Sequence, residues 1–535
     1  MPRRSHVVPA TVLVFLFLLT ALLNGCASLP LDYPRPVSTA LLLPEKTDMG
    51  KRIQPHVAQH QGKSGFYLLP NGEDAFLARV LAIDQAERTL DLQYYKFNDD
   101  LTGKFLMDRL VSAAERGVRV RLLLDDWPRT GQMAWGLAMV QANPNIEVRV
   151  FNPFGGLRSV FLSRAFQAVF VAKRLRARMH NKMFIADNCL AIVGGRNIGD
   201  EYFGARAELT FGDLDIMAIG PITRGISTAF DDYWNCPLSI PIKALLKRQP
   251  TAAETDEFRR SLAENRQSVQ NSGYAQKLQE ANLSKRVEAG HIPYVWAEGE
   301  VLYDDPLKVI ESDDSSRKVL MGRQLKSIID EAQSEVLVIS PYFIPGKRGM
   351  LWFEQLRERG ITVKVLTNSL ASTDVPIAEG GYDHYRKALL GIGVELYELK
   401  PNPHQYRFWA RTGLGSSSRG ALHAKTVIVD RKVVFVGSFN LDPRSARLNT
   451  EDGVAVRSAE LGAQATHIFD RGISLRDAYR VEILGESPVS EEWHGLVWIT
   501  EENGREVHYY QDPMTGFWCR LEVRILYLLA PESTL

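Results

Sequence analysis

Cysteine is scarce in this sequence, with four residues among 535: Cys26, Cys189, Cys236 and Cys519. They form no CxxC pair and no Cys/His spacing typical of zinc, and they do not make a disulfide framework. An excess of one charge is also lacking, since 64 basic residues face 63 acidic ones. A strongly basic surface is therefore not a global property of the chain, and we expect no nucleic-acid partner.

Acidic residues are absent from the first 25 positions. Arg3 and Arg4 precede an apolar run from Val7 to Leu23, which is short for a membrane span and typical of a secretory signal. The exit Leu-Asn-Gly-Cys resembles a bacterial lipobox, which predicts lipid attachment at Cys26. We expect residues 1–25 to be a lipoprotein-type signal peptide and the protein to be exported, anchored to a membrane and facing the periplasm. An uncleaved anchor is the alternative.

The chain contains an internal duplication. The segment RARMHNKMFIADNCLAIVGGRN is echoed by LHAKTVIVDRKVVFVGSFN, and five positions match at one constant offset. These pairs are His180 with His423, Lys182 with Lys425, Asp187 with Asp430, Gly194 with Gly437, and Asn197 with Asn440. Both halves alternate helical patterns with short apolar runs, which predicts an α/β fold made of two α/β/α sandwich domains.

Composition suggests the domain limits. We assign residues 26–65 to a tether, 66–240 to the first domain, 241–300 to polar linker helices, and 301–535 to the second domain with a C-terminal extension. The residues after about Pro488 are predicted to form aromatic-rich strands that close the chain.

Each motif is predicted to be a β-hairpin. His180 and Lys182 lie two residues apart on a strand and so share a face, and the chain turns near Asp187-Asn188. Asn197 then returns to the open end of the hairpin beside His180. The second copy is expected to turn about Arg431-Lys432. Asp187 and Asp430 are candidate site residues, although a strand length separates them from the histidines and favours a role in supporting the turn.

These residue types suit a phosphodiester. Lys182, Lys425, Asn197 and Asn440 can stabilise the non-bridging oxygens while phosphorus is attacked. One histidine can act as nucleophile and form a phosphohistidine, while the other protonates the leaving alkoxide and later activates the acceptor. With the two motifs facing each other, neither a metal nor a cofactor is required.

Each histidine needs a carboxylate on its far ring nitrogen. Asp213 and Glu451 open corresponding strands after the two motifs. We expect Asp213 to orient His180 and Glu451 to orient His423, each within its own half. Capping of a turn is the alternative role for both acids.

At these residues the chain resembles the phospholipase D superfamily, whose signature is a duplicated HxK(x)4D(x)6G[GS]xN. SFNLDPRSARLNTE, LTNSLASTDVP and ENGREVHYYQDPMTGFW resemble the bacterial cardiolipin synthase C-type members. The resemblance implies transfer of a phosphatidyl group to phosphatidylglycerol at a membrane surface, with His180 as nucleophile and His423 as acid/base.

Three other functions stay open at this point. Hydrolysis to phosphatidic acid would use the same motifs, because only the acceptor differs. An exported nucleic-acid phosphodiesterase is less favoured by the charge balance. A lipid-binding scaffold without activity would not require both complete motifs.

Overall fold

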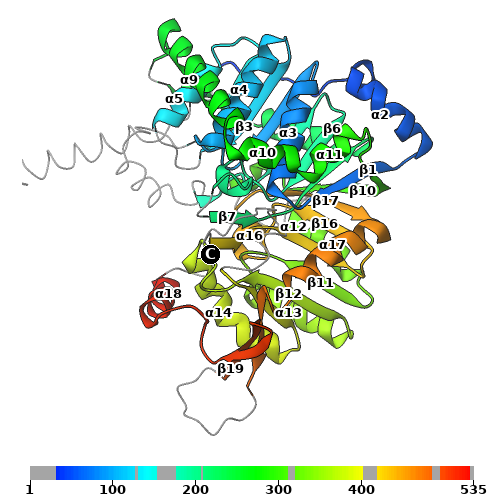
Figure 1. Cartoon of the computed structure of the whole chain (residues 1–535), viewed down its shortest axis with the longest axis vertical. Helices are drawn as coiled ribbons and strands as arrows, with labels where there is room; N and C mark the ends of the chain where they lie inside the picture. Colours follow the sequence, from blue (N-terminus) through cyan, green and yellow to red (C-terminus); the bar gives the residue numbers. More distant parts are fainter. Residues whose placement is uncertain are drawn as a thin grey trace, which may run out of the picture.

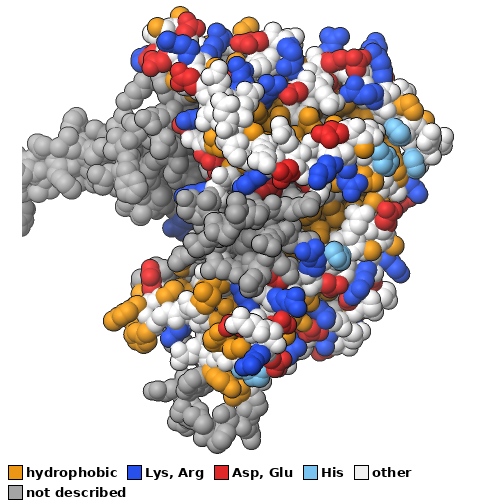
Figure 2. Space-filling view, in the orientation of Figure 1, with side chains coloured by type: hydrophobic (Ala, Val, Ile, Leu, Met, Phe, Trp, Pro, Cys, Tyr) orange, Lys and Arg blue, Asp and Glu red, His pale blue; other side chains and the backbone are white. Residues whose placement is uncertain are grey.

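The computed structural model describes residues 30, 32–126, 131–153, 176–206, 209–246, 248–310, 320–401, 419–484 and 495–529. The signal peptide expected at 1–25 and the lipidation expected at Cys26 therefore lie outside the described residues. The molecule has two stacked halves (Figure 1). Figure 2 shows basic and acidic side chains interspersed over the face in view. None of the helices in the described ranges combines the length and hydrophobicity that crossing a bilayer requires.

The first half and the connection that follows it contain nine strands and eight of the labelled helices in the described residues. The strands are β1 (Ser64–Leu69), β2 (Thr89–Tyr94), β3 (Arg119–Asp125), β4 (Ile146–Phe151), β5 (Lys182–Ala186), β6 (Leu190–Gly194), β7 (Leu209–Gly212), β8 (Asp215–Ile219) and β9 (Ser239–Pro241). The helices are α2 (Asp48–Gln59), α3 (Gly72–Gln85), α4 (Leu101–Glu115), α5 (Gly131–Val140) and α8 (Ile222–Trp234), followed by the connecting α9 (Ala252–Gln270), α10 (Gly273–Glu280) and α11 (Asn282–Glu288).

The second half repeats this plan and adds a C-terminal extension. Its strands are β10 (Val295–Tyr303), β11 (Glu335–Ile339), β12 (Thr362–Asn368), β13 (Glu395–Leu399), β14 (Arg419–Leu422), β15 (Lys425–Val429), β16 (Val433–Gly437), β17 (Asp452–Arg457), β18 (Ala478–Ile483), β19 (Leu496–Glu502) and β20 (Arg505–Tyr509). Its helices are α12 (Met321–Asp330), α13 (Gly346–Glu358), α14 (Pro376–Gly391), α16 (Pro443–Arg447), α17 (Ala459–Gly472) and α18 (Phe517–Leu529).

The two halves share one continuous sheet. In the first half its order is β9-β4-β3-β2-β5-β6-β8-β1, with β2, β3 and β4 parallel. The second half runs β17-β16-β15-β11-β12-β13-β18-β19-β20. Strand β10 joins them, because Phe66 of β1 pairs with Val295 and Asp452 of β17 pairs with Tyr303. The prediction of a duplicated α/β fold is confirmed.

Three hydrophobic cores hold the layers together. The outer core of the first half packs α3 and α4 on the sheet, and that of the second half packs α12, α13 and α14. The middle core takes residues from both halves, including Phe230 of α8 and Phe469 of α17. Because burying apolar area is the main stabilising contribution, this shared core fixes the halves against each other.

The structure differs from the sequence prediction in the tether, in the linker and at the end of the chain. The described part of the expected 26–65 tether is not free: α2 lies within it, and Arg121 donates to the carbonyl of Ser38 at 2.8 Å. Strand β10 begins at Val295, inside the expected 241–300 linker. The prediction that strands close the chain was wrong for α18, which places Val523 and Tyr527, four residues apart, on one face.

Both motif hairpins form as predicted, with one shift. Asp187 and Asn188 have φ of 50° and 51°, the left-handed conformation of a tight hairpin turn. In the second copy the corresponding residues are Asp430 and Arg431, one position before the expected pair. The carboxylate of Asp187 accepts hydrogen bonds from the backbone N–H groups of residues 87, 88 and 89, at 2.9, 2.8 and 2.8 Å.

Asp187→Ala should destabilise the fold by about 3 kcal/mol, because it leaves three partly or fully buried N–H groups without their acceptor. Urea unfolding followed by circular dichroism would measure the change. The matched variant Asp430→Ala should cost less, because the N–H groups that Asp430 binds, those of residues 333, 334 and 335, are more exposed to water. Equal unfolding midpoints for wild type and Asp187→Ala would contradict the assignment.

Candidate active site

The predicted catalytic side chains gather at the junction of the two halves. His180 lies two residues before the Lys182 that opens β5, and His423 lies between β14 and the Lys425 that opens β15. All four side chains are buried. Burial lowers the pKa of His423 well below its usual value, and the charges of Lys425, Lys182 and His180 lower it further. Groups of both motifs therefore act within one electrostatic environment.

Each histidine is paired with the carboxylate of the other half. His180 Nδ1 lies 2.8 Å from Glu451 Oε2, and His423 Nδ1 lies 2.6 Å from Asp213 Oδ2. The prediction of pairs within each half was wrong, whereas both acids do contact a predicted catalytic histidine. With Nδ1 bound to a carboxylate, Nε2 is the ring nitrogen of each imidazole that is left to react.

Backbone pairing between the halves explains the exchange. β7 and β14 form a two-stranded parallel sheet in which Gly212 pairs with Leu422, so Asp213 and His423 leave it together. A parallel bridge between Met179 and Thr450 likewise places His180 beside Glu451. His180 N–H donates to the Thr450 carbonyl at 2.8 Å, and His423 N–H donates to the Gly212 carbonyl at 2.7 Å.

The two acids have different surroundings. Glu451 also accepts hydrogen bonds from the hydroxyls of Ser438 and Ser445, at 2.6 and 2.7 Å. Although burial opposes it, the pKa of Glu451 lies below its usual value because of His180, Lys182 and the Ser438 hydroxyl. Burial raises the pKa of Asp213. A Cβ at Gly195 would lie 2.1 Å from Asp213 Oδ1, so glycine is required where the second copy uses Ser438.

The lysines are poised between charged and neutral forms. Burial lowers the pKa of Lys182 to about 7 and that of Lys425 to about 8. Each ammonium donates to the backbone carbonyl of its own histidine, and Lys425 Nζ lies 3.1 Å from His423 Nδ1. A bound phosphate anion would favour the charged form of both.

The two asparagines are not equivalent. Asn197 accepts a hydrogen bond from the N–H of Lys96 at 3.1 Å and donates to the Tyr202 hydroxyl at 2.9 Å. Within the described residues, the buried Oδ1 of Asn440 has no hydrogen-bond partner. Asn197 therefore supports the site wall, and Asn440 has an acceptor oxygen to offer a donor group of a ligand.

Sequence reasoning missed the aromatic walls and the serines. Tyr95 lies edge-on to His180 with ring centroids 5.1 Å apart, and Tyr202 and Phe211 flank His423 at 5.2 Å each. These aromatic residues recur at no motif spacing, so only the fold brings them to the imidazoles. Ser438 could have been identified from the sequence, because it occupies the variable Gly/Ser position of the second motif.

The crossed pairs predict which variants behave alike. Asp213→Asn should resemble loss of His423 function, and Glu451→Gln should resemble loss of His180 function, each with a fall of about 10² to 10⁴-fold in turnover. A donor with an acidic leaving group, which departs without protonation, should restore the first step in Asp213→Asn, seen as a burst of leaving group, and should not restore it in Glu451→Gln. The opposite rescue pattern would contradict the crossed assignment.

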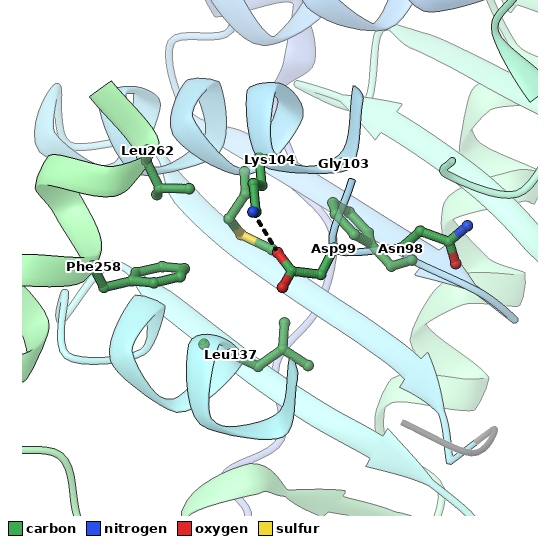
Figure 3. Close-up of a pocket in the computed structure, with 10 residues that line it drawn as sticks. Asn98, Asp99, Gly103, Lys104, Leu137, Phe258 and Leu262 are labelled. Carbon is green, nitrogen blue, oxygen red and sulfur yellow. Dashed lines mark ion pairs between the residues drawn. The ribbon is translucent and has the colours of Figure 1, made fainter. Parts of the chain in front are cut away.

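Figure 3 shows a separate hollow, which is lined in part by residues 97–99, next in the chain to the Lys96 that binds Asn197. Phe97, Met107, Leu137, Phe258 and Leu262 give it apolar walls, and Lys104 faces Asp99 with nitrogen and oxygen 3.7 Å apart. None of the predicted catalytic residues is among those that line it in the described part of the chain.

The chain matches known proteins along most of its length. The family described as "Cardiolipin synthase, PLD-like domain" matches twice, at residues 80–234 and 325–473. Cardiolipin synthase C of Escherichia coli is 36% identical over 90% of this chain and 99% of that relative. Cardiolipin synthase B of Salmonella typhimurium is 24% identical over 78% of this chain and 81% of its own length. A crystal structure of phosphatidylserine synthase from Haemophilus influenzae has a TM-score of 0.53 at 13% identity, covering 80% of this chain and 91% of that one, and shows the same fold.

Proposed function

We propose that this chain, which belongs to the cardiolipin synthase-like branch of the phospholipase D superfamily, is a phosphatidyltransferase that forms cardiolipin. The observation that carries the proposal is the pair of buried histidines, each bound through Nδ1 to a carboxylate of the opposite half and accompanied by a lysine. Such a site provides two imidazoles for a group transfer that takes place in two steps.

In the first step, His180 Nε2 attacks the donor phosphorus. A P–N bond forms, the P–O bond to the leaving alcohol breaks, and protonated His423 gives that oxygen a proton. Glu451 is a suitable partner for the nucleophilic His180, because an ionised carboxylate stabilises the positive charge that the imidazole gains when it attacks. The phosphodiester anion would raise the pKa of His423 by offsetting the nearby lysine charges, which favours the acid form that this step requires.

In the second step, a hydroxyl of phosphatidylglycerol attacks the phosphohistidine. His423 takes the hydroxyl proton, a new P–O bond forms and the P–N bond breaks, so His180 is restored. Lys182, Lys425 and Asn440 can donate hydrogen bonds to the non-bridging oxygens in both steps.

The similarity to cardiolipin synthases C and B supports a lipid acceptor over water. Hydrolysis to phosphatidic acid is the alternative reaction at the same site, and cleavage of nucleic acid is disfavoured by the balanced charge.

We also propose that the signal at 1–25 exports the protein and that lipid attachment at Cys26 holds it at a membrane facing the periplasm. The lipobox-like Leu-Asn-Gly-Cys exit supports this location.

The test of the function is lipid mass spectrometry after expression in a bacterium that lacks its own cardiolipin synthases. Cardiolipin should appear with the wild-type chain and not with His180→Ala. Phosphatidic acid accumulating without cardiolipin would instead support hydrolysis.

The pKa values of the two lysines predict how kcat/KM and kcat change at alkaline pH. Lys182 and Lys425 are cationic below about pH 7 and 8 and lose their protons above. Because the free enzyme needs these cations to bind an anionic phosphate, kcat/KM should fall above about pH 7 to 8. kcat should hold to higher pH, since bound phosphate raises both pKa values. Steady-state rates from pH 5 to about 9.5 would test this, and kcat/KM flat across that range would contradict it.

A further inference from the structure

Five large apolar side chains of the C-terminal extension are exposed. They are Tyr510, Met514, Phe517, Trp518 and Ile525, with exposed fractions of 47, 66, 63, 77 and 47%. We call them the α18 patch. Figure 2 shows hydrophobic side chains gathered over α18. Exposed apolar side chains that gather in one place mark an interaction site more often than scattered ones do.

The α18 patch rests on a firm support. Val523 of α18 is buried, and Tyr527 stacks on His384 of α14 with centroids 5.6 Å apart. The loop before α18 is held as well, because Asp512 forms an ion pair with the buried Arg386 of α14 at 2.9 Å. In Figure 1, α18 lies against α14 on the flank of the second half. Because α18 is packed on α14, the exposed side chains of the α18 patch are held at the protein surface.

Helix α14 begins beside the active site. Asp374, two residues before it, accepts a hydrogen bond from the Tyr342 hydroxyl at 2.8 Å. The charge of Asp374 acts to raise the pKa of Lys425, so this carboxylate lies near the catalytic ammonium. Helix α14 therefore begins within the electrostatic environment of Lys425, and further along its His384 and Arg386 hold α18 and the loop before it.

The chemistry of the α18 patch matches a lipid interface. Tryptophan and tyrosine are favoured where hydrocarbon meets headgroups, since their rings are apolar and their edges polar. Arg520 lies among these side chains, and with Tyr510, Met514 and Thr515 it lines a surface hollow. A guanidinium beside exposed aromatics suits a phosphate headgroup above acyl chains.

We infer that the α18 patch docks on a phospholipid bilayer, with Phe517 and Trp518 inserted among the headgroups. This inference rests on the proposed function, whose substrates lie in a bilayer. The support on α14 would then hold the active site at the membrane surface, so that a lipid can enter the catalytic cluster without leaving for water.

Cys519 offers a direct test, because its thiol is exposed while Cys189 and Cys236 are buried. In the full chain carrying Cys26→Ser, a fluorophore on Cys519 should be quenched by brominated lipids in phosphatidylethanolamine/phosphatidylglycerol vesicles. A matched label at Leu351→Cys, in the same chain with Cys519→Ser, should be quenched at least about threefold less, because Leu351 is exposed on α13, outside the patch. Equal, weak quenching at both positions of the vesicle-bound protein would overturn the inference.

Activity separates docking from catalysis. Phe517→Ser/Trp518→Ser should lower transfer in vesicles by at least about tenfold, whereas transfer between short-chain lipids dispersed in detergent should change less than about twofold. The control Leu351→Ser should change neither rate.

If the wild type transfers nothing, the proposed function fails while the Cys519 label still reports docking, because His180→Ala should insert equally. A dimer that light scattering detects and the double variant dissociates would overturn the inference in favour of a second copy.

Discussion

His180→Ala should lower phosphatidyl transfer by at least about 10⁴-fold, because no P–N bond can form without the imidazole and no other buried nucleophile takes its place in the proposed steps. Thin-layer separation of radiolabelled cardiolipin from purified enzyme and phosphatidylglycerol would measure the loss. His291→Ala, which changes an exposed histidine in the connection between the halves, is the matched control and should keep full activity.

Removing His180 also takes from the buried Glu451 the imidazole that stabilises its charge, so a weakened fold would contribute to the loss. His180→Gln separates the two effects. Its side-chain amide can still donate to Glu451 and preserve stability, yet it cannot act as a nucleophile at phosphorus. A His180→Gln enzyme that folds like the wild type and turns over within tenfold of it would end the nucleophile assignment.

His423→Ala should lower transfer from natural donors by a similar factor. The two variants should differ in which step they block. With a phosphatidyl donor whose leaving group is a nitrophenol, no proton needs to be supplied for departure. His180 should then react once, giving a burst of about one nitrophenol per enzyme, and stop because no base activates the acceptor.

The trapped adduct gives this prediction a second readout. Mass spectrometry of His423→Ala after the burst should find one phosphatidyl group, labile to acid, on the peptide that contains His180. His180→Ala with the same donor should show neither burst nor adduct. A burst from His180→Ala and none from His423→Ala would reverse the two roles.

The local features of the site could be predicted from the sequence because they depend on short-range rules. The spacing of His180 and Lys182 fixed their common face, and the apolar runs on either side of Asp187 fixed the hairpin. The repeated offset between the motifs predicted the duplicated fold. Each of these inferences uses residues separated by about a strand length or by a whole repeat.

The partners of the histidines could not be predicted in the same way. Glu451 reaches His180 across 271 positions, and Asp213 reaches His423 across 210. The choice between the two acids depends on the parallel pairing of β7 with β14, which involves four residues in each strand. Such short pairings have no signature in a single sequence, so pairing within each half was the simpler expectation.

The C-terminal helix was missed for a different reason. FWCRLEVRILYLL contains aromatic and β-branched residues that favour strands, and its apolar positions do not follow one clear period. Its contact with α14 decides the outcome, because Val523 and Tyr527 pack on that helix only if they lie on one helical face.

The exchange of acids between the halves also bears on how the protein is made. A ribosome delivers His180 long before Glu451, so the first half of the nascent chain holds an imidazole that has no carboxylate to orient it. The missing partner arrives only when most of the second half has been synthesised. The enzyme is therefore inert through most of its own synthesis, and lipid chemistry begins only once both halves have folded together.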